Sequence, residues 1–368
     1  MHHGLFANQG ERSTKMRKQY WLAITLLVTT LAACASAYWW TRAHQQHSSV
    51  LAFLPRDPAA VLYIDIAALR QSPFLAQLAA WAPQPQKDPD YAQFVADTSF
   101  NFERDLDHVA IAAVESWRAF VIVGEGRFDR KKISAYAQRI GALKNRGGRE
   151  IISLPYSVDT LGSELTFLSD RVVLLVTAAG LDKSLGAKEN LDADKDWKER
   201  FDRLAGSPVF AVIRANRVPG YLGVPRSYSS PQLSSLLARL QWITIAAKPD
   251  ADQLRLVAEG EAASESTSHQ LADVLNSVVI LAQTGLNDPK VRQQLNPLVR
   301  QAYLDLLKSA DISKLDRGET KAVRLIVSVT PAFLEAARIS LPLQAPQPLP
   351  SNPMPRKHPA ASPRKSGT

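Results

Sequence analysis

The chain has 368 residues, 46% of them hydrophobic, so it can bury a substantial core, and its net charge of +9 first suggests a nucleic-acid partner. Nine of the 44 basic and one of the 35 acidic residues lie before residue 51 or after residue 341, which leaves 35 basic against 34 acidic residues between. This nearly neutral body argues against nucleic-acid binding, and a single cysteine excludes an intramolecular disulfide and a cysteine zinc site.

An uncharged stretch of 21 residues, Tyr20–Trp40, follows a short basic segment. A helix of that length spans about 32 Å, enough to cross the hydrocarbon core of a bilayer. Aromatic residues stand at both of its ends, and the basic excess on its N-terminal side places residues 1–19 in the cytoplasm. We predict that residues 20–40 form a transmembrane anchor, that 41–50 is a spacer, and that the body lies on the periplasmic or extracellular side.

Two other interpretations share this orientation. Leu31-Ala32-Ala33-Cys34 resembles the bacterial lipobox, which makes Cys34 a lipidation candidate and the chain a lipoprotein. Ala35-Ser36-Ala37 fits the cleavage site of a signal peptide, for which residues 1–19 supply the basic n-region. Met16 is an alternative start to Met1.

The body reads as two α+β halves, 51–203 and 204–340. Each half contains an apolar strand, a helix, a two-stranded hairpin, a second helix and further strand. The closest internal similarity pairs residues 105–140 with residues 239–275, "DLDHVAIAA" with "RLQWITIAA" and "VGEG" with "AEGE". We therefore predict a degenerate duplication of a βαββαβ-like, ferredoxin-like unit.

Local signals define several elements within these halves. Val61–Ile66 is an apolar run typical of a strand buried on both faces. Asp129 should cap a helix that Gly141 ends, and Pro297 should kink a helix that begins at Pro289. A further helix is expected to begin at Ser72-Pro73.

The C-terminal tail, residues 341–368, has eight prolines in 28 residues and a basic excess. Such a composition cannot bury a core, so we predict a disordered tail.

"LAFLPRDPAAVLYIDIAALRQSP" (51–73) and "FNFERDLDHVAIAA" (100–113) resemble an uncharacterised class of N-terminally anchored bacterial envelope proteins with a domain of unknown function. They share a Leu-Pro-x-Asp opening, a strand ending in Asp, and an Arg-Asp-Leu step before a hairpin. The resemblance implies export, anchoring and a repeated α+β body. It transfers no activity and no site residue.

Motifs for catalysis or metal binding are weak. His108 and His269 are the only histidines of the body, and we interpret both as surface or edge residues without ligand spacing. Gly124–Asp129, "GEGRFD", hints at a phosphate cradle but favours a tight strand exit, since the third glycine is missing. Asp192–Asp196 has calcium-like spacing but reads as an ordinary helix start. We predict no cofactor and no metal.

A long connection, residues 217–232, joins a strand to a helix. Long loops in compact domains often bind partners, and this one carries rigid or planar groups of the kind enriched at interfaces. Its binding candidates are Tyr221, Arg226 and Tyr228.

We expect a non-enzymatic cell-envelope protein whose exported body binds a protein or an envelope component. The alternative is an envelope hydrolase or ligand-binding protein that uses carboxylates such as Asp65 and Asp105, which we place at strand ends.

Overall fold

The computed structural model describes residues 50–340, except 73, 75–88, 115–116, 155–161, 178–190, 192–193, 219–234, 251 and 319. Its strands are β1 (Ala60–Asp65), β2 (Leu106–Val114), β3 (Ala119–Gly126), β4 (Leu143–Arg146), β5 (Arg149–Leu154), β6 (Ser163–Phe167), β7 (Val172–Thr177), β8 (Val209–Arg214), β9 (Leu240–Asp250), β10 (Gln253–Ala262), β11 (Asp311–Arg317) and β12 (Thr320–Val329).

The helices lie between and after these strands. They are α2 (Ile66–Gln71), α4 (Pro89–Thr98), α5 (Phe102–Asp105), α6 (Arg130–Arg139), α8 (Lys195–Leu204), the short η3 (Ala215–Arg217), α10 (Glu265–Asn287), α11 (Pro289–Gln294), α12 (Pro297–Lys308) and α13 (Pro331–Ser340).

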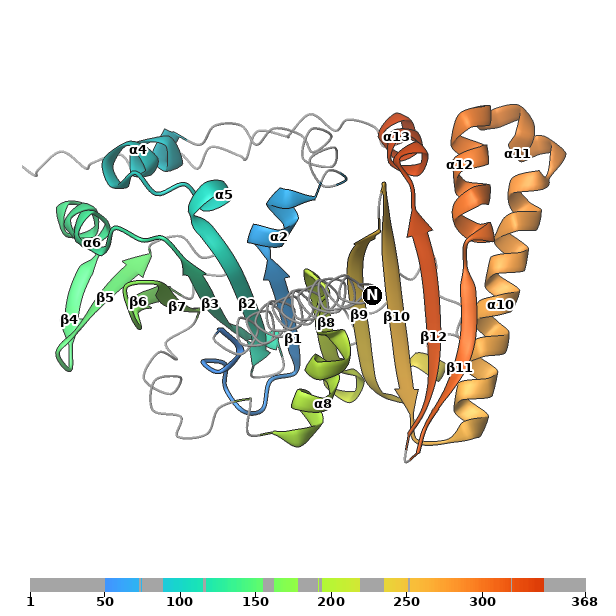
Figure 1. Cartoon of the computed structure of the whole chain (residues 1–368), viewed down its shortest axis with the longest axis horizontal. Coiled ribbons are helices and arrows are strands. Elements are labelled where there is room, and N and C mark those ends of the chain that lie inside the picture. Colours follow the sequence, from blue (N-terminus) through green and yellow to red (C-terminus); the bar gives the residue numbers. More distant parts are fainter. Residues whose placement is uncertain are drawn as a thin grey trace, which may run out of the picture.

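The protein is a mixed α+β fold built on one large antiparallel sheet (Figure 1). The sheet has 12 strands in the order β11-β12-β10-β9-β8-β1-β2-β3-β7-β6-β5-β4. Read outward from the β8–β1 pair, both directions begin with one strand and a hairpin, after which two strands, β12 and β11, follow on one side and four, β7, β6, β5 and β4, on the other. The strands on both sides of residue 204 therefore belong to a single sheet.

The strand order differs from the ferredoxin-like unit that we expected. In that unit, crossover helices join parallel strands that lie on the same sheet. Here β1 instead pairs directly with β2 in the antiparallel sense, although α2, α4 and α5 lie between them in sequence. The segment from α2 to α5 therefore connects antiparallel neighbours, whereas α6 leads from β3 to β4 and α10–α12 lead from β10 to β11, which are not neighbours in the sheet.

The two central hairpins match in detail. In β2–β3, the partners Leu106–Gly126 and His108–Glu125 leave Asp107 as a bulge. In β9–β10, the partners Leu240–Ala262 and Trp242–Glu261 leave Gln241 as a bulge at the corresponding position.

A glycine next to each bulge accommodates a leucine. A Cβ on Gly124 would lie 3.2 Å from Cδ1 of Leu106, and a Cβ on Gly260 would lie 2.8 Å from Cδ1 of Leu240. In both hairpins, the missing side chain of the glycine therefore leaves room for the leucine on the partner strand.

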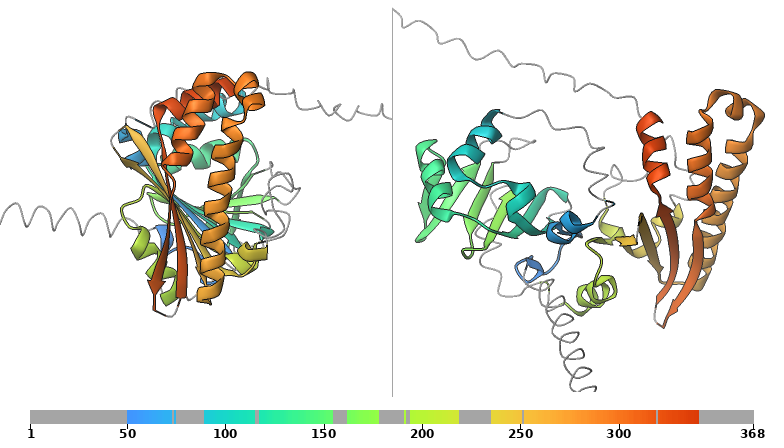
Figure 2. Two further views of the ribbon diagram at one scale, coloured as in Figure 1. Left: turned by 90° about the vertical axis from the view of Figure 1, so that its right-hand side faces the viewer. Right: turned by 45° about the horizontal axis from the view of Figure 1, so that its top comes forward.

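Helices cover both faces of the sheet (Figure 2). On one face, Trp197 and Phe201 of α8 and the segment 50–54 pack against the largest core, which includes Val61, Tyr63 and Phe210. On the other face the clusters are separate: α6 packs near β4–β6, α10 packs on β9–β12, and α12 contacts α13.

The predicted cap of α6 agrees with the structure, whereas the prediction of one kinked helix from Pro289 is wrong. Asp129 caps α6, its carboxylate accepting from the backbone N–H of Lys132 at 3.1 Å. The predicted kinked helix is instead divided into α11 and α12 at Pro297. Leu295 is extended at the end of α11, and Asn296 caps the start of α12. The helix expected from Ser72-Pro73 falls largely outside the described residues.

The N-terminal anchor Tyr20–Trp40 and the tail 341–368 also lie outside the described residues. Within the part of the chain that the structure describes, no helix combines the length and apolar character needed to cross a membrane.

Candidate functional site

Two aspartates where α5 meets β2 organise the candidate site. Asp105 ends α5, and Asp107 is the bulged residue of β2. Four arginines from separate segments pair with these carboxylates. We call them the arginine cluster: Arg70 of α2, Arg104 of α5, Arg127 after β3 and Arg171 before β7. Four positive and two negative charges leave this cluster with an excess of positive charge.

Asp105 is held ionised by its neighbours. Arg104 donates from Nε to Oδ1 at 2.9 Å and from Nη2 to Oδ2 at 2.7 Å, and the backbone N–H of Asn101 donates to Oδ2 at 2.9 Å. The hydrogen bonds from Arg104 lower the pKa of Asp105 to about 2, assisted by Asn101 and the charge of Arg127, although burial acts in the opposite direction. A carboxylate in this state is a structural anchor and a poor proton donor.

Asp107 joins two arginines of different exposure. Arg70 donates from Nη2 to Oδ1 at 2.8 Å and from Nη1 to the carbonyls of Glu103 and Leu106, so most of its donors serve the protein itself. Arg171 donates from Nη2 to Oδ2 at 3.2 Å, and its side chain is 62% exposed. Arg171 is therefore positioned by Asp107 while presenting donors to solvent.

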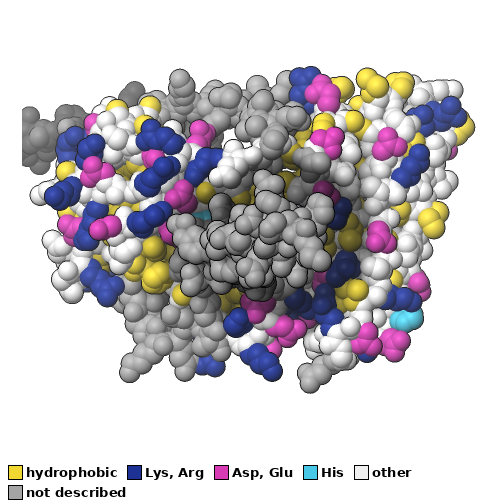
Figure 3. All heavy atoms as spheres, in the orientation of Figure 1, with side chains coloured by type: hydrophobic (Ala, Val, Ile, Leu, Met, Phe, Trp, Pro, Cys, Tyr) yellow, Lys and Arg dark blue, Asp and Glu magenta, His cyan; other side chains and the backbone are white. Residues whose placement is uncertain are grey.

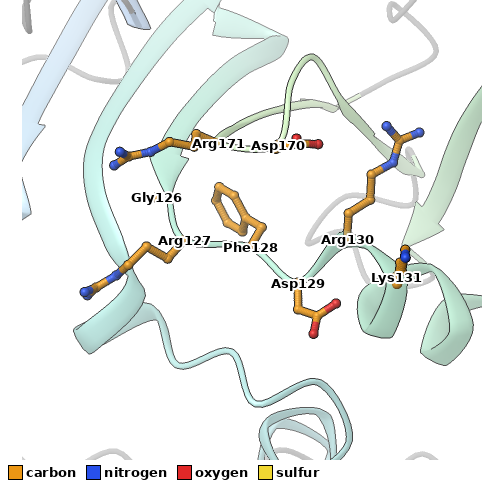
Figure 4. A pocket seen from close by; sticks show the side chains of 8 residues that line it. All are labelled: Gly126, Arg127, Phe128, Asp129, Arg130, Lys131, Asp170 and Arg171. Carbon is orange, nitrogen blue, oxygen red and sulfur yellow. The ribbon is translucent and has the colours of Figure 1, made fainter.

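A groove of about 670 Å³ opens beside the cluster. Its lining consists of residues 126–131, which run from the end of β3 into α6, and of Asp170 and Arg171 from the β6–β7 turn. Figure 4 shows that Arg127 and Arg171 extend toward the same side, with the Phe128 ring between their backbones. The side chain of Arg127 is 61% exposed, while Nη2 donates to the carbonyl of Arg104.

Two further charged residues of the groove, Arg130 and Asp129, have structural roles. Arg130 pairs with Glu150 at 3.0 Å and lies 5.6 Å above the Phe167 ring centroid. Asp129 serves as the N-cap of α6 and, in Figure 4, points away from the turn that carries Arg171. Lys and Arg side chains gather on this part of the surface, over α4–α6 (Figure 3).

The arrangement suits the binding of an anion. A guanidinium presents a planar fork of donors that matches phosphate and carboxylate oxygens, and two forks on one side of a groove can hold one anionic group. The described contacts of Arg127 and Arg171 use only part of their donors.

The predicted motif "GEGRFD" lies in this groove. Gly126 is a tight strand exit, as expected, since a Cβ there would lie 2.3 Å from the carbonyl oxygen of Asp105. The same exit also places Arg127 in the lining of the groove, and the sequence interpretation missed this role. The available signal was a basic residue directly at each of two strand ends, Arg127 after β3 and Arg171 before β7.

His108 was expected to be a surface or edge residue, and this prediction is wrong. Its side chain is buried because Tyr63 packs beside it, with 3.1 Å between the Tyr63 hydroxyl and Nδ1. Asp65 lies 3.6 Å from the same nitrogen. Burial, with the charges of Asp65 and Glu125, raises the pKa of Tyr63 far above its ordinary value. His269 is exposed, as expected, and lies 3.4 Å from Glu265.

The carboxylates of the hydrolase alternative have separate structural roles. Asp65 caps α2 by accepting from the backbone N–H of Ala68 at 2.7 Å, whereas Asp105 is paired with Arg104. No described group of three or more His, Cys, Asp or Glu side chains could hold a metal ion. Asp194 caps α8, as expected for an ordinary helix start, while Asp192 lies outside the described residues.

A second polar cluster lies near β9. Glu261 is buried and accepts from Arg200 and Arg203 of α8. The guanidinium carbon of Arg200 lies 4.0 Å from the Trp242 ring centroid. Beside it, a smaller groove of about 380 Å³ is lined by Arg214 and Trp242 among others. Here the positive charges are mostly stacked on rings or paired.

Four predicted site residues lie outside the described residues: Cys34, Tyr221, Arg226 and Tyr228.

Comparison with known proteins gives no family. No family model matches the chain, and no curated protein matches it. Among solved structures, crystal form III of TP0453 aligns with a TM-score of 0.43 and 11% sequence identity, covering 79% of this chain and 97% of that chain. Crystal form IV of TP0453 aligns with a TM-score of 0.42 and 11% identity, covering 80% and 97%.

Proposed function

We propose that this chain is a non-enzymatic cell-envelope protein, anchored near its N-terminus, whose exported body binds an anionic envelope component in the arginine-lined groove. The observation that carries the proposal is the pair Arg127 and Arg171, both more than 60% exposed and extended toward one side of the groove. Anchoring rests on the uncharged segment Tyr20–Trp40, with lipidation at Cys34 or cleavage as the alternatives.

The network around the groove supports binding of a charged group. Asp105 and Asp107 orient the arginines before any ligand arrives, which reduces the conformational entropy that binding would otherwise cost. The excess positive charge of the cluster then attracts phosphate or carboxylate groups.

Inorganic phosphate is the simplest probe of the groove. We expect millimolar binding to the full-length protein, and we expect the double variant Arg127→Gln, Arg171→Gln to weaken it by about tenfold or more, a loss of about 1.4 kcal/mol. The matched control is Arg255→Gln, Arg338→Gln. It removes the same charge from two arginines that are 50% and 58% exposed and that each pair with one carboxylate elsewhere.

Equal phosphate binding by the two double variants and the unaltered protein would refute the groove as the binding site. Fractionation tests the location separately. The full-length protein should sediment with membranes, and mass spectrometry of the mature N-terminus should show an uncut chain, a lipidated Cys34 or a cleaved end. A product found wholly in the cytosol would refute anchoring.

A further inference from the structure

An apolar row crosses one face of the sheet. The strand registers place one residue from each of six adjacent strands directly opposite the next. From β7 to β9 this central apolar row consists of Leu175, Ile122, Ile111, Leu62, Ala211 and Ile245. Strand spacing of about 4.8 Å makes the stretch from β3 to β9 about 19 Å long.

The two faces of these strands differ in burial. Side chains on the opposite face, such as Val61, Ala110 and Val212, are fully buried under α8 and the segment 50–54. The members of the central apolar row are half-buried, and Ile245 is 42% exposed. A continuous apolar surface with this exposure costs free energy in water, which indicates contact with an apolar partner.

Helices cover both ends of the same row. Beyond Leu175 it continues through Leu165 and Ile152, which pack with α6. Beyond Ile245 it continues through Ala258 and Leu325 to Ile312, which packs with the α10 cluster. Within the part of the chain that the structure describes, the middle of the row is thus half-exposed between two helix-packed regions.

Strands β3 and β7 lead from the central apolar row to the arginine-lined groove. Alternate residues of a strand share a face, so Ile122, Gly124 and Gly126 of β3 lead from the row to the groove. On the neighbouring strand, Leu175 and Val173 lead to Arg171, whose carbonyl accepts from the N–H of Gly126 at 2.9 Å. Four residues of strand, about 13 Å, separate the apolar row from the groove.

The side chains around Gly124, between groove and row, are apolar. A Cβ on Gly124 would lie 3.2 Å from both Leu106 Cδ1 and Val173 Cγ2, so these two side chains line the step. A ligand could therefore place an anionic group at the arginines and run a flexible chain along an unbroken apolar path.

We propose that the groove and the central apolar row form one site for an anionic amphiphile: a lipid whose phosphate group pairs with Arg127 and Arg171 and whose acyl chain lies along Ile122, Ile111 and Leu62. This inference rests on the proposed function and specifies its ligand. The exposed arginines at one end complement a negatively charged head group, and the apolar row at the other end complements an acyl chain. A lipid satisfies both ends, whereas a free anion satisfies only the first.

Three probes test head-group binding and chain binding at this site independently. Full-length protein in a non-ionic detergent is titrated with radiolabelled hexadecyl phosphate, which has both a head group and a chain. Glycerol 3-phosphate supplies the head group alone, and hexadecanol supplies the chain alone. We expect hexadecyl phosphate to bind at least about 100-fold more tightly than either fragment, because burying each methylene adds about 0.8 kcal/mol.

Variants assign the two ends. Ile122→Glu should weaken hexadecyl phosphate by about tenfold or more and leave glycerol 3-phosphate unchanged, because the added carboxylate lies on the chain path. Ile280→Glu is the matched control, since Ile280 of α10 is 61% exposed and lies on a helix outside the row. Ile111→Thr, which keeps β-branching and strand propensity, should also weaken the chain-bearing probe, and it serves if Ile122→Glu does not fold.

The outcomes distinguish the two proposals. If glycerol 3-phosphate binds as tightly as hexadecyl phosphate and Ile122→Glu changes neither, the lipid inference is wrong and the anion site stands. If neither phosphate compound binds, both proposals are wrong. If hexadecanol binds as tightly as hexadecyl phosphate, the arginines do not hold the head group and the combined site is refuted.

Discussion

The two central hairpins, β2–β3 and β9–β10, share their strand pairing and bulge, but different side chains form the polar cluster at each. In β2–β3, Glu125 lies opposite His108, whose other neighbour in the sheet is Asp65. In β9–β10, Glu261 lies opposite Trp242, whose other neighbour is Arg214. The bulged residue, Asp107 or Gln241, directly precedes His108 or Trp242 in each case.

The covering helix accounts for the difference. α8 supplies Arg200 and Arg203 to Glu261, so the second cluster combines a buried acid with several arginines. In the first hairpin the corresponding ring is the buried His108, which contacts Tyr63 instead. A repeated backbone therefore leaves the charge of each cluster to the elements packed over it. The groove of about 670 Å³ that contains Arg127 and Arg171 lies at strand ends of the first half.

The largest expected effect comes from Glu261→Gln. The change removes the charge that compensates Arg200, whose side chain is 6% exposed, so we expect a loss of about 3–5 kcal/mol in the free energy of unfolding. Urea unfolding followed by circular dichroism measures it. Glu125→Gln is the matched change in the first hairpin and should cost clearly less, because Glu125 is only half-buried. Equal losses would show that α8 does not distinguish the clusters.

Gly126→Ala is expected to have the next largest effect. Its Cβ would lie 2.3 Å from the carbonyl oxygen of Asp105, a backbone atom that cannot rotate away, so we expect a loss of about 1–3 kcal/mol in urea unfolding. The second hairpin carries Ala262 at the corresponding position. Gly260→Ala is the control: its nearest neighbour is the flexible end of Leu240, and it should cost less. A harmless Gly126→Ala would mean that the strand exit is not constrained.

The pH dependence of stability tests the anchor of the arginine cluster. The pKa of Asp105 is lowered from 3.8 to about 2 in the folded protein. Its contribution to stability is therefore present above pH 4 and is lost as the pH falls from about 4 to 2, where the unfolded state binds the proton first. Asp105→Asn should be less stable at pH 7 and should have a shallower decline in melting temperature between pH 4 and 2.

The control for this measurement is Asp202→Asn. Asp202 pairs with Lys198 on the exposed surface of α8, and both side chains are more than 60% exposed. This variant should keep the pH profile of the unaltered protein. Parallel profiles for all three proteins would contradict the role assigned to Asp105.

Short-range patterns in the sequence predicted much of the fold. The apolar run from Val61 predicted β1, and the paired runs around residues 115–116 predicted β2 and β3. The N-cap carboxylate of Asp129 predicted α6. These signals work because strand alternation and helix capping depend on residues close together in the chain.

Other elements lacked such signals. β11, "DISKLDR", is half polar because it is an edge strand of the sheet, and it was not predicted. The ferredoxin-like order was wrong because strand periodicity does not reveal which strands pair. β1 and β2 are neighbours despite some 40 intervening residues.

The candidate site depended on such long-range pairing. Arg70, Arg104, Arg127 and Arg171 span about 100 residues of chain, and they converge only because β2, β3 and β7 are adjacent. The sequence contains the two aspartates at spacing i, i+2, but nothing local identifies their partners.

The smallest expected effect concerns the first cluster alone. Tyr63→Phe removes the hydroxyl that contacts Nδ1 of the buried His108, while the ring can keep its stacking on Phe210, 4.9 Å away. The expected loss is about 1 kcal/mol in urea unfolding, the net contribution of one buried hydrogen bond. Tyr91→Phe is the control, since its hydroxyl only accepts an exposed bond of 3.3 Å from the N–H of Phe102. The second hairpin has Trp242 in place of His108 and lacks this contact. Equal losses for Tyr63→Phe and Tyr91→Phe would show that the first cluster depends on ring packing rather than on the contact between the Tyr63 hydroxyl and His108.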